Sequence, residues 1–240
     1  MEVVLLRVGI DTGSGGTHGP LFSDGSFEYI PIPDCFGGKG VDQRTYGNIR
    51  GREGRTLVDY FPEGRRERFS RQSVHFDPEF ETFTYGDPTP PKASLRRLSE
   101  GSLLVFYAGL KGWDFDCLAA LHIIGYFEVA QAAFATSFGQ AELAGTFQNN
   151  FHFMHGEVFE DQKDRLVLVK GNANSRLLQK AVRISVVGKD RNGCPLHRLA
   201  EDMQNVFGDF GGNTSIQRSP PRWVAPEFTQ RAAQFVLALR

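Results

Sequence analysis

The chain has 240 residues, enough for one large domain or two small ones, and 40% of them are hydrophobic, as in ordinary globular proteins. Its formal net charge of −1 excludes a global field that attracts polyanions, so any affinity for nucleic acid must come from a local patch. Three widely separated cysteines exclude a disulfide scaffold and a zinc ribbon and favour a reduced, cytoplasmic compartment. No apolar run approaches the ~18 residues of a membrane span and the first residues do not resemble a signal peptide, so we expect no membrane segment.

The first part of the chain begins with a strand and then changes character. Residues 2–11 are β-branched and apolar, which predicts a buried strand. Residues 26–34 alternate, but Pro31 and Pro33 lack the N–H group that a central ladder needs, so we expect an edge strand or an irregular extended segment. Residues 37–71 hold eight arginines and one lysine against five acids, which predicts a basic, glycine-rich inserted lobe.

The second part predicts further strands, followed by helices. Residues 101–113 and 121–134 are typical of strands, and Gly125 marks a bulge or a close approach. Residues 194–208 place apolar side chains at helical spacing before Gly208, which predicts a helix that ends there. We also expect a helix or loop at residues 146–155, a strand at 164–173, and a strand closed by a turn at 177–193. The last expected element is a helix at residues 225–240, whose buried stripe is Phe228, Ala232, Phe235 and Leu239.

This order, with strands first and helices late, predicts an α+β fold in a single domain of residues 1–240. We expect a mixed, mostly antiparallel, barrel-like sheet with helices at the C-terminal end. Residues 100–134 are also similar to the strand pair of PUA-like barrels of the EVE and YTH types, which hold a modified base in an aromatic-lined pocket. A PUA-like core is therefore one expected form of the sheet, although Ser102 stands where those barrels have aspartate.

Five glycines lie between Gly9 and Gly19, in a loop that follows the first strand. Glycine is costly in ordered backbone unless a positive φ or a close approach requires it, so the loop predicts contact with a ligand or with another part of the chain. The dinucleotide fingerprint is excluded because His18 stands at its third glycine, and the mononucleotide P-loop is excluded because lysine is missing. A backbone nest for an anion and a structural tight loop both remain.

Three blocks of sequence carry a resemblance to a known family. Residues 5–34 contain a strand, an Arg-x-Gly-x-Asp-Thr core, a Gly-Gly pair, an Asp-Gly turn and an Ile-Pro-Ile-Pro segment. Residues 75–80 contain a His-x-Asp-Pro block, and residues 103–129 join an aromatic strand to a Gly-Tyr-x-x-Val strand. The residues that match are Arg7, Gly9, Asp11, Thr12, Gly15, Gly16, Pro20, Asp24, Gly25, Pro31, Ile32, Pro33, His75, Asp77 and Pro78.

These blocks resemble the third family of nucleotide-modification-associated domains, over most of the first 130 residues. That family is associated with nucleic-acid base modification in phage and bacterial systems, including defence. The resemblance therefore implies a role beside a nucleotide, but it does not imply a particular reaction.

The candidate catalytic residues are Asp11, His75 and Asp77. Asp11 follows a strand, where a carboxylate can be a ligand or the cap of a turn. His75 and Asp77 lie two residues apart, so on a strand both face the same side and could transfer protons. With Asp11 and His18 they could also form a cluster of two acids and two imidazoles that binds a metal ion or transfers protons. The alternatives are that Asp77 only fixes the turn before Pro78 and that His18 only faces solvent.

A second pair of imidazoles, His152 and His155, lies at helical spacing. No acid stands at a known spacing from this pair, so it does not predict a metal centre. The sequence assigns no metal site and leaves both the cofactor and the need for a metal unknown.

Nucleotide contacts are predicted at arginines and aromatic residues. Guanidinium groups suit phosphate oxygens, unless the basic lobe is only a solvated surface, and aromatic rings can stack a base, unless they belong to the core. The candidates for the nucleic-acid backbone are Arg50, Arg52, Arg65 and Arg66. The candidates for the nucleotide itself are Arg7, Gly15, Gly16, His18, Tyr107 and Trp113.

We therefore expect a cytoplasmic protein that binds a nucleotide or an extruded base and takes part in nucleic-acid base modification. A non-catalytic reader of modified bases and a hydrolase or transferase of free nucleotides are the alternatives, so the sequence does not decide whether the protein is an enzyme. The expected partner is nucleic acid or a nucleotide, not a membrane, and the oligomeric state stays open.

Overall fold

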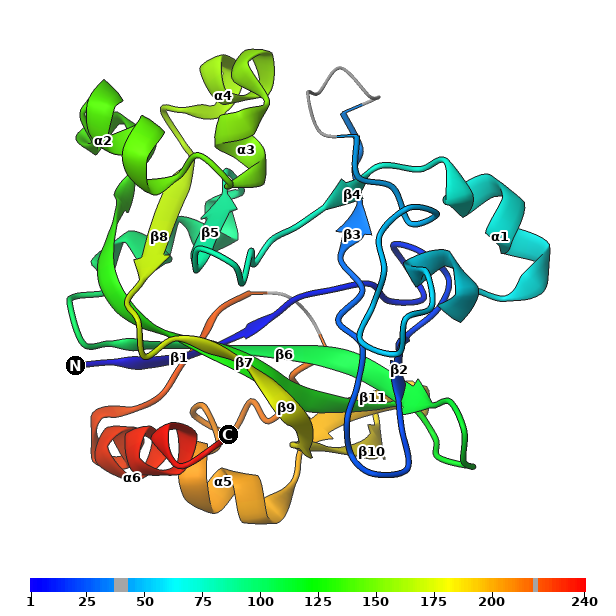
Figure 1. Cartoon of the computed structure of the whole chain (residues 1–240). Coiled ribbons are helices and arrows are strands. Elements are labelled where there is room, and N and C mark those ends of the chain that lie inside the picture. Colours follow the sequence, from blue (N-terminus) through cyan, green and yellow to red (C-terminus); the bar gives the residue numbers. More distant parts are fainter. Residues whose placement is uncertain (37–42, 218–219) are drawn as a thin grey trace.

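The computed structural model describes residues 1–36, 43–217 and 220–240, so the first six residues of the predicted basic lobe lie outside it (Figure 1). One large sheet of eight strands is accompanied by two small sheets, β3–β4 and β10–β11. The large sheet contains β1 (Val3–Arg7), β2 (Gly19–Leu21), β5 (Thr84–Asp87), β6 (Leu103–Gly112), β7 (Ala120–Phe134), β8 (Val167–Gly171), β9 (Arg176–Arg183) and β12 (Arg222–Trp223). The small sheets contain β3 (Ile32–Pro33), β4 (Val74–His75), β10 (Ser185–Lys189) and β11 (Pro195–Leu199).

Helices cover both sides of the large sheet. In Figure 1, α5 and α6 lie below it, whereas α1 to α4 belong to two lobes above it. Within the described chain, no helix is both long and apolar enough to cross a membrane. The helices are α1 (Glu63–Ser70), α2 (Gln140–Thr146), α3 (Phe151–Met154), α4 (Gly156–Gln162), α5 (Glu201–Phe207) and α6 (Pro226–Leu237), with 3-10 turns η1 (Leu57–Tyr60), η2 (Pro90–Arg97) and η3 (Ala135–Ser137).

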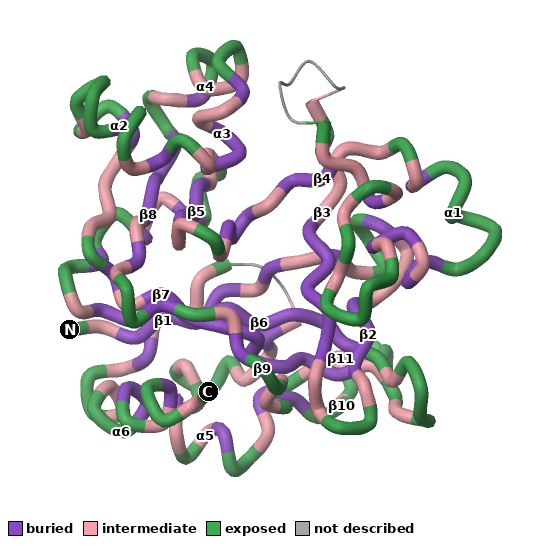
Figure 2. Tube along the Cα trace, in the orientation of Figure 1, coloured by how far each residue is buried: buried purple, intermediate pink, exposed green. Residues whose placement is uncertain are grey.

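The antiparallel pair β6–β7 forms the centre of the sheet, where the two apolar stretches predicted strands. Both strands are buried along most of their length, as the purple tube of Figure 2 shows. The pairing of β7 with β9 shifts register between Ile123 and Gly125. A Cβ atom on Gly125 would lie 2.6 Å from the carbonyl oxygen of Arg176, so only glycine permits this approach. The predicted bulge or close approach at Gly125 is therefore confirmed.

The large sheet is mixed and mostly antiparallel, as predicted, but it does not close into a barrel. Among the described pairings of this sheet, only those of β1 and β2 with β6 are parallel. The order of neighbouring strands runs from β12 through β1, β6, β7 and β8 to β5. The first half of β7 pairs with β9 and the second half with β8. Because the halves of β7 have different partners, the sheet branches and its end strands stay unpaired with each other. The barrel-like form was wrong, and the PUA-like core is not confirmed.

The described part of the basic lobe, residues 43–71, has a hydrophobic core of its own. The lobe contributes rings and aliphatic groups from its turns, η1 and the end of α1, which is why no helical or strand period predicted this core. The buried members of the core, including those from neighbouring segments, are Ile10, Ile30, Tyr46, Leu57, Val58, Tyr60, Phe61, Phe69 and Val74.

The C-terminal third confirms one predicted helix and corrects another. The last helix forms as α6, with Pro226 in its first turn; Ala232 is buried, while Phe228 and Phe235 are only partly buried against the core. Residues 194–208 were predicted as one helix, but residues 195–199 form β11 and only the end forms α5, before Gly208. The pairing of β11 with β10 overrides the helical spacing. The strand predicted at 177–193 is likewise two strands, β9 and β10.

We predict that His122 makes the fold sensitive to acid. Burial on β7 lowers the pKa of His122 from 6.5 to about 4. Because the unfolded chain then binds more protons than the fold between these values, stability falls as the pH drops from 6.5 towards 4. Between pH 7 and pH 5 this group should remove about 2 kcal/mol from the free energy of unfolding.

The measurement is urea unfolding of wild type and His122→Asn at pH 7 and pH 5. Asparagine can still donate to the carbonyl oxygen of Ala120, which the imidazole Nδ1 approaches at 3.1 Å. The variant should lose less stability than wild type between the two pH values. Equal losses in both proteins would contradict the assignment.

Candidate functional site

Two cavities flank the glycine loop, residues 8–20. The first cavity measures about 770 Å³, and Asp11 and Ser14 of the loop contribute to its lining. The second cavity measures about 660 Å³, and Gly16, Thr17 and His18 contribute to it. Residues predicted to form one site are therefore divided between two: Arg7, Asp11, His75 and Asp77 line the first cavity, and Gly16, His18, Arg66 and Trp113 line the second.

Asp11 holds the glycine loop together. Its Oδ1 accepts the backbone N–H groups of Gly13 and Ser14, each at 2.8 Å, and its Oδ2 lies 3.0 Å from Arg7 Nη2. Burial acts to raise the pKa of Asp11, but the hydrogen bonds from Ser14 and the charge of Arg7 outweigh burial and lower it. The structure thus gives Asp11 the capping role that was one of its two alternatives, and a catalytic role stays a prediction.

Gly16 leaves space for an arginine, whereas Gly15 leaves space for Ile10. Arg65 Nη1 donates to the carbonyl oxygen of Gly15 at 3.1 Å. Gly16 has φ +71°, and a Cβ atom there would lie 1.4 Å from the same Nη1 atom. The close approach that the glycine content predicted is therefore made to a side chain of the basic lobe.

The four arginines predicted for the nucleic-acid backbone all donate to carbonyl oxygens of their own chain. Arg50 reaches Gly54, and Arg52 reaches Leu178, each at 2.9 Å. Arg66 donates through Nε and Nη2 to two carbonyl oxygens at the η1 turn, and Arg65 binds the glycine loop as described. Arg52 and Arg65 thus tie the basic lobe to β9 and to the glycine loop, whereas Arg50 and Arg66 bond within the lobe. Contact of these arginines with phosphates stays a prediction.

The predicted stacking residues do not meet. Tyr107 is completely buried and donates from its hydroxyl group to the carbonyl oxygen of Ile216 at 3.0 Å. Trp113 is 39% exposed on the second cavity, edge-on to Tyr60. Burial, with help from Arg7, lowers the pKa of His18 beside the same cavity. A nucleotide role for Tyr107, Trp113 and His18 stays a prediction. Trp113 and His18 line the second cavity, whereas Tyr107 lines neither of the two cavities.

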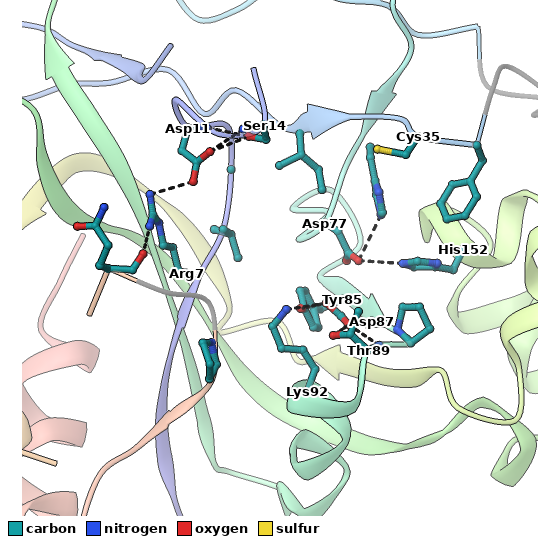
Figure 3. Close-up of a pocket in the computed structure, with 18 residues that line it drawn as sticks. Arg7, Asp11, Ser14, Cys35, Asp77, Tyr85, Asp87, Thr89, Lys92 and His152 are labelled. Carbon is teal, nitrogen blue, oxygen red and sulfur yellow. Dashed lines mark hydrogen bonds and ion pairs between the residues drawn. The ribbon is translucent and has the colours of Figure 1, made fainter. Parts of the chain in front are cut away.

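The first cavity contains a buried cluster of His75, Asp77 and His152. Figure 3 shows Asp77 and His152 facing each other in this cavity. Asp77 Oδ2 lies 3.5 Å from His75 Nε2 and 3.3 Å from His152 Nε2. His75 belongs to β4, Asp77 follows it, and His152 lies on α3. The predicted proximity of His75 and Asp77 is confirmed, whereas Asp11 and His18 do not join them.

Sequence reasoning missed the third member of this cluster. His152 was paired with His155 by spacing, yet only His152 turns to Asp77, far away along the chain. Its other ring nitrogen, Nδ1, lies 2.8 Å from Gln162 Oε1 of α4. The only sequence signal was the aromatic and histidine-rich run at 151–155, which does not identify a partner.

Electrostatics separates the two histidines. Burial acts to raise the pKa of Asp77, but its contacts with the two imidazoles outweigh burial and lower it. Burial lowers the pKa of His75 despite Asp77, whereas for His152 the contacts with Asp77 and Gln162 outweigh burial and raise the pKa. The pKa values of the two imidazoles around this one carboxylate are thus shifted in opposite directions, an arrangement that acid–base sites also show.

The same cavity carries a second polar group that the sequence did not single out. Lys92 of η2 lies 2.8 Å from Asp87 Oδ2, and the hydroxyl group of Tyr85 donates to the same oxygen at 3.1 Å. The cations of this cavity, Arg7 and Lys92, are therefore each paired with an acid. Apolar groups complete the lining, namely Val8, Ile32, Phe36, Pro88 and Pro220.

The family model described as nucleotide modification associated domain 3 matches residues 2–238. The chain belongs to this family. The match extends the resemblance of the first 130 residues to nearly the whole chain, including the segment that contributes His152. A comparison of the chain with curated proteins found no match, and neither did a comparison with solved structures.

We predict that Gly16→Ala costs more stability than Gly54→Ala. Both glycines have φ +71°, but a Cβ atom at Gly54 meets nothing within 4 Å. Both variants should lose about 1 kcal/mol to the left-handed conformation. Gly16→Ala should lose about 1 kcal/mol more, because it displaces Arg65 from its hydrogen bond with Gly15.

Urea unfolding measures the difference, and an Arg65→Ala background tests its cause. In that background the two alanine variants should cost the same. An excess cost that persists without the Arg65 side chain would show that Arg65 is not its origin.

Proposed function

We propose that the chain binds a nucleotide or an extruded base in the first cavity and takes part there in nucleic-acid base modification. Membership of nucleotide modification associated domain 3 supports the nucleotide context. The observation that carries the proposal is the buried His75–Asp77–His152 cluster on the wall of a cavity of about 770 Å³. This volume lies within the roughly 300–1,000 Å³ of ordinary ligand pockets.

The charges of the first cavity favour a base over a bare phosphate. Arg7 and Lys92 are already neutralised by Asp11 and Asp87, so little uncompensated positive charge faces the ligand. Apolar side chains and several hydrogen-bonding groups remain, and these suit a flat ring with polar edges. We therefore place the base in the first cavity and not the phosphates.

The phosphates are placed towards the second cavity. Arg66 and Lys111 line that cavity, and the glycine loop contributes to both cavities. Trp113 offers a ring there that could contact a neighbouring base or sugar. This arrangement keeps the predicted nucleotide role of His18, Gly16 and Trp113 and gives Arg7 and Asp11 a role in shaping the first cavity.

Two alternatives differ in their chemistry. A reader of modified bases would use the same cavity without a reaction, and a hydrolase or transferase would act on free nucleotides. The buried acid–base cluster favours an enzyme over a reader. The pKa of His75 is lowered and that of His152 is raised around one carboxylate, and recognition of a base alone does not require such a pair.

We predict that Phe36→Ala weakens nucleotide binding. Phe36 lines the first cavity, and loss of a stacking ring typically weakens binding about 5- to 100-fold. The measurement is the equilibrium affinity for nucleoside monophosphates and for single- and double-stranded DNA and RNA, at two salt concentrations. A strong salt dependence for the oligonucleotides would identify a polynucleotide as the ligand.

The matched control is Phe115→Ala, which removes a 37% exposed ring that lines neither of these cavities. Its affinity should stay within about twofold of wild type. Equal losses in both variants would place the ligand elsewhere, and no binding to any probe would remove the proposed function.

We predict that Asp77→Asn separates an enzyme from a reader. The substitution keeps the shape of the side chain and removes the charge between the two imidazoles, so binding should persist while the reaction is lost. Nucleosides from cells that express wild type or Asp77→Asn are digested and compared by mass spectrometry. A modified nucleoside found only with wild type supports an enzyme; the same nucleosides in both, with binding intact, support a reader.

A further inference from the structure

Two distances in the cluster match the spacing between ligands of one metal ion. Asp77 Oδ2 lies 3.3 Å from His152 Nε2 and 3.5 Å from His75 Nε2, and ligand atoms from all three residues lie within 4.8 Å of one another. Nitrogen and oxygen ligands at about 2.0–2.2 Å from a tetrahedral ion lie roughly 3.3–3.6 Å apart. Hydrogen bonds between nitrogen and oxygen are shorter, about 2.7–3.2 Å. Both contacts of Asp77 thus fit ligands around an ion better than hydrogen bonds.

Each ligand is oriented by a second contact. The backbone N–H of Gly86 on β5 donates to Asp77 Oδ1 at 2.8 Å, which leaves Oδ2 for the cluster. Gln162 Oε1 accepts from His152 Nδ1 at 2.8 Å, and an imidazole protonated at Nδ1 can present the lone pair of Nε2 to a metal. The ring of His75 stacks on Phe151 with centroids 3.7 Å apart. Such outer contacts are typical of metal ligands.

The third observation is a buried nitrogen without a hydrogen bond. His75 Nε2 has no hydrogen-bond partner, although the side chain of His75 is only 10% exposed. Buried polar atoms are rarely left unsatisfied in native structures. A metal ion in the cluster would satisfy this nitrogen together with Asp77 Oδ2 and His152 Nε2.

We propose that His75, Asp77 and His152 bind one divalent first-row transition metal ion, with the remaining coordination positions open to the first cavity. Two imidazoles and one carboxylate are a ligand set that zinc and non-haem iron centres use when they keep open positions. The site is independent of any nucleotide, and only its action on a base rests on the proposed function. It also revises the sequence analysis, which assigned no metal.

The test uses the purified full chain, stripped with a chelator and then reloaded with Zn²⁺ or Co²⁺. Mass spectrometry of the metal content should find one Zn²⁺ ion per chain, and Co²⁺ should give the visible absorption of a site with nitrogen and oxygen ligands. Asp77→Asn, His75→Gln and His152→Gln should each weaken binding at least about tenfold. His197→Gln, which removes an imidazole outside the cluster, should bind like wild type.

Circular dichroism of each variant separates lost binding from lost folding, and the Co²⁺ spectrum of wild type does not depend on any variant. Wild type that binds neither ion would overturn the metal site and leave an acid–base cluster bridged by a proton. Metal content that is equal in wild type and in all three folded cluster variants would also overturn it. If the chain binds nucleotide but no metal ion, the metal site has failed. If it binds a metal ion but no nucleotide, the proposed function has failed.

Gln162 supplies a test of ligand orientation. Gln162→Leu removes the acceptor for His152 Nδ1 and should weaken Co²⁺ binding about 10- to 100-fold. Gln162→Glu keeps an acceptor at this position and should restore binding. Gln162 is a positioning residue in this proposal, so equal affinities for the leucine and glutamate variants would contradict its role.

Discussion

The antiparallel pairing of β6 with β7 is the interaction on which the other elements depend. Each further strand of the large sheet pairs with β6, with β7, or with a strand that does so. Both central strands are buried along most of their length, so the hydrophobic effect and the ladder hydrogen bonds act on the same residues. Because β7 is longer than any one of its partners, the sheet branches, and two lobes rise above the same face (Figure 1).

The first cavity is lined by residues from both lobes, and the carboxylate of Asp77 connects them. One oxygen accepts the backbone N–H of β5, and the other faces His75 of β4 and His152 of α3. A buried charge is costly unless several partners compensate it, so these elements must assemble together around Asp77. The same arrangement underlies the chemistry that we propose, because a carboxylate shared by two imidazoles can hold a proton or a metal ion.

The glycine loop shows how composition can indicate a ligand and yet serve the fold. Its acid caps its own turn, and Gly15 and Gly16 leave space for Ile10 and Arg65, respectively. Four arginines of the basic lobe donate to carbonyl oxygens: Arg52 and Arg65 attach the lobe to its neighbours, and Arg50 and Arg66 bond within it. The local charge of a segment therefore does not reveal how many of its cations face a ligand. The loop also contributes residues to both cavities, which is why we propose that it contacts the ligand.

The sequence by itself determined what depends on neighbouring residues: the apolar strands β1, β6 and β7, the helix α6, the close approach at Gly125 and the pairing of His75 with Asp77. The motifs of the first 130 residues also indicated the family. Tertiary structure decided what depends on distant partners. Residues 195–199 form a strand because β10 pairs with them, and the sheet stays open because the halves of β7 have different partners. His152 completes the cluster because α3 packs beside β5, a contact that no spacing within the sequence encodes.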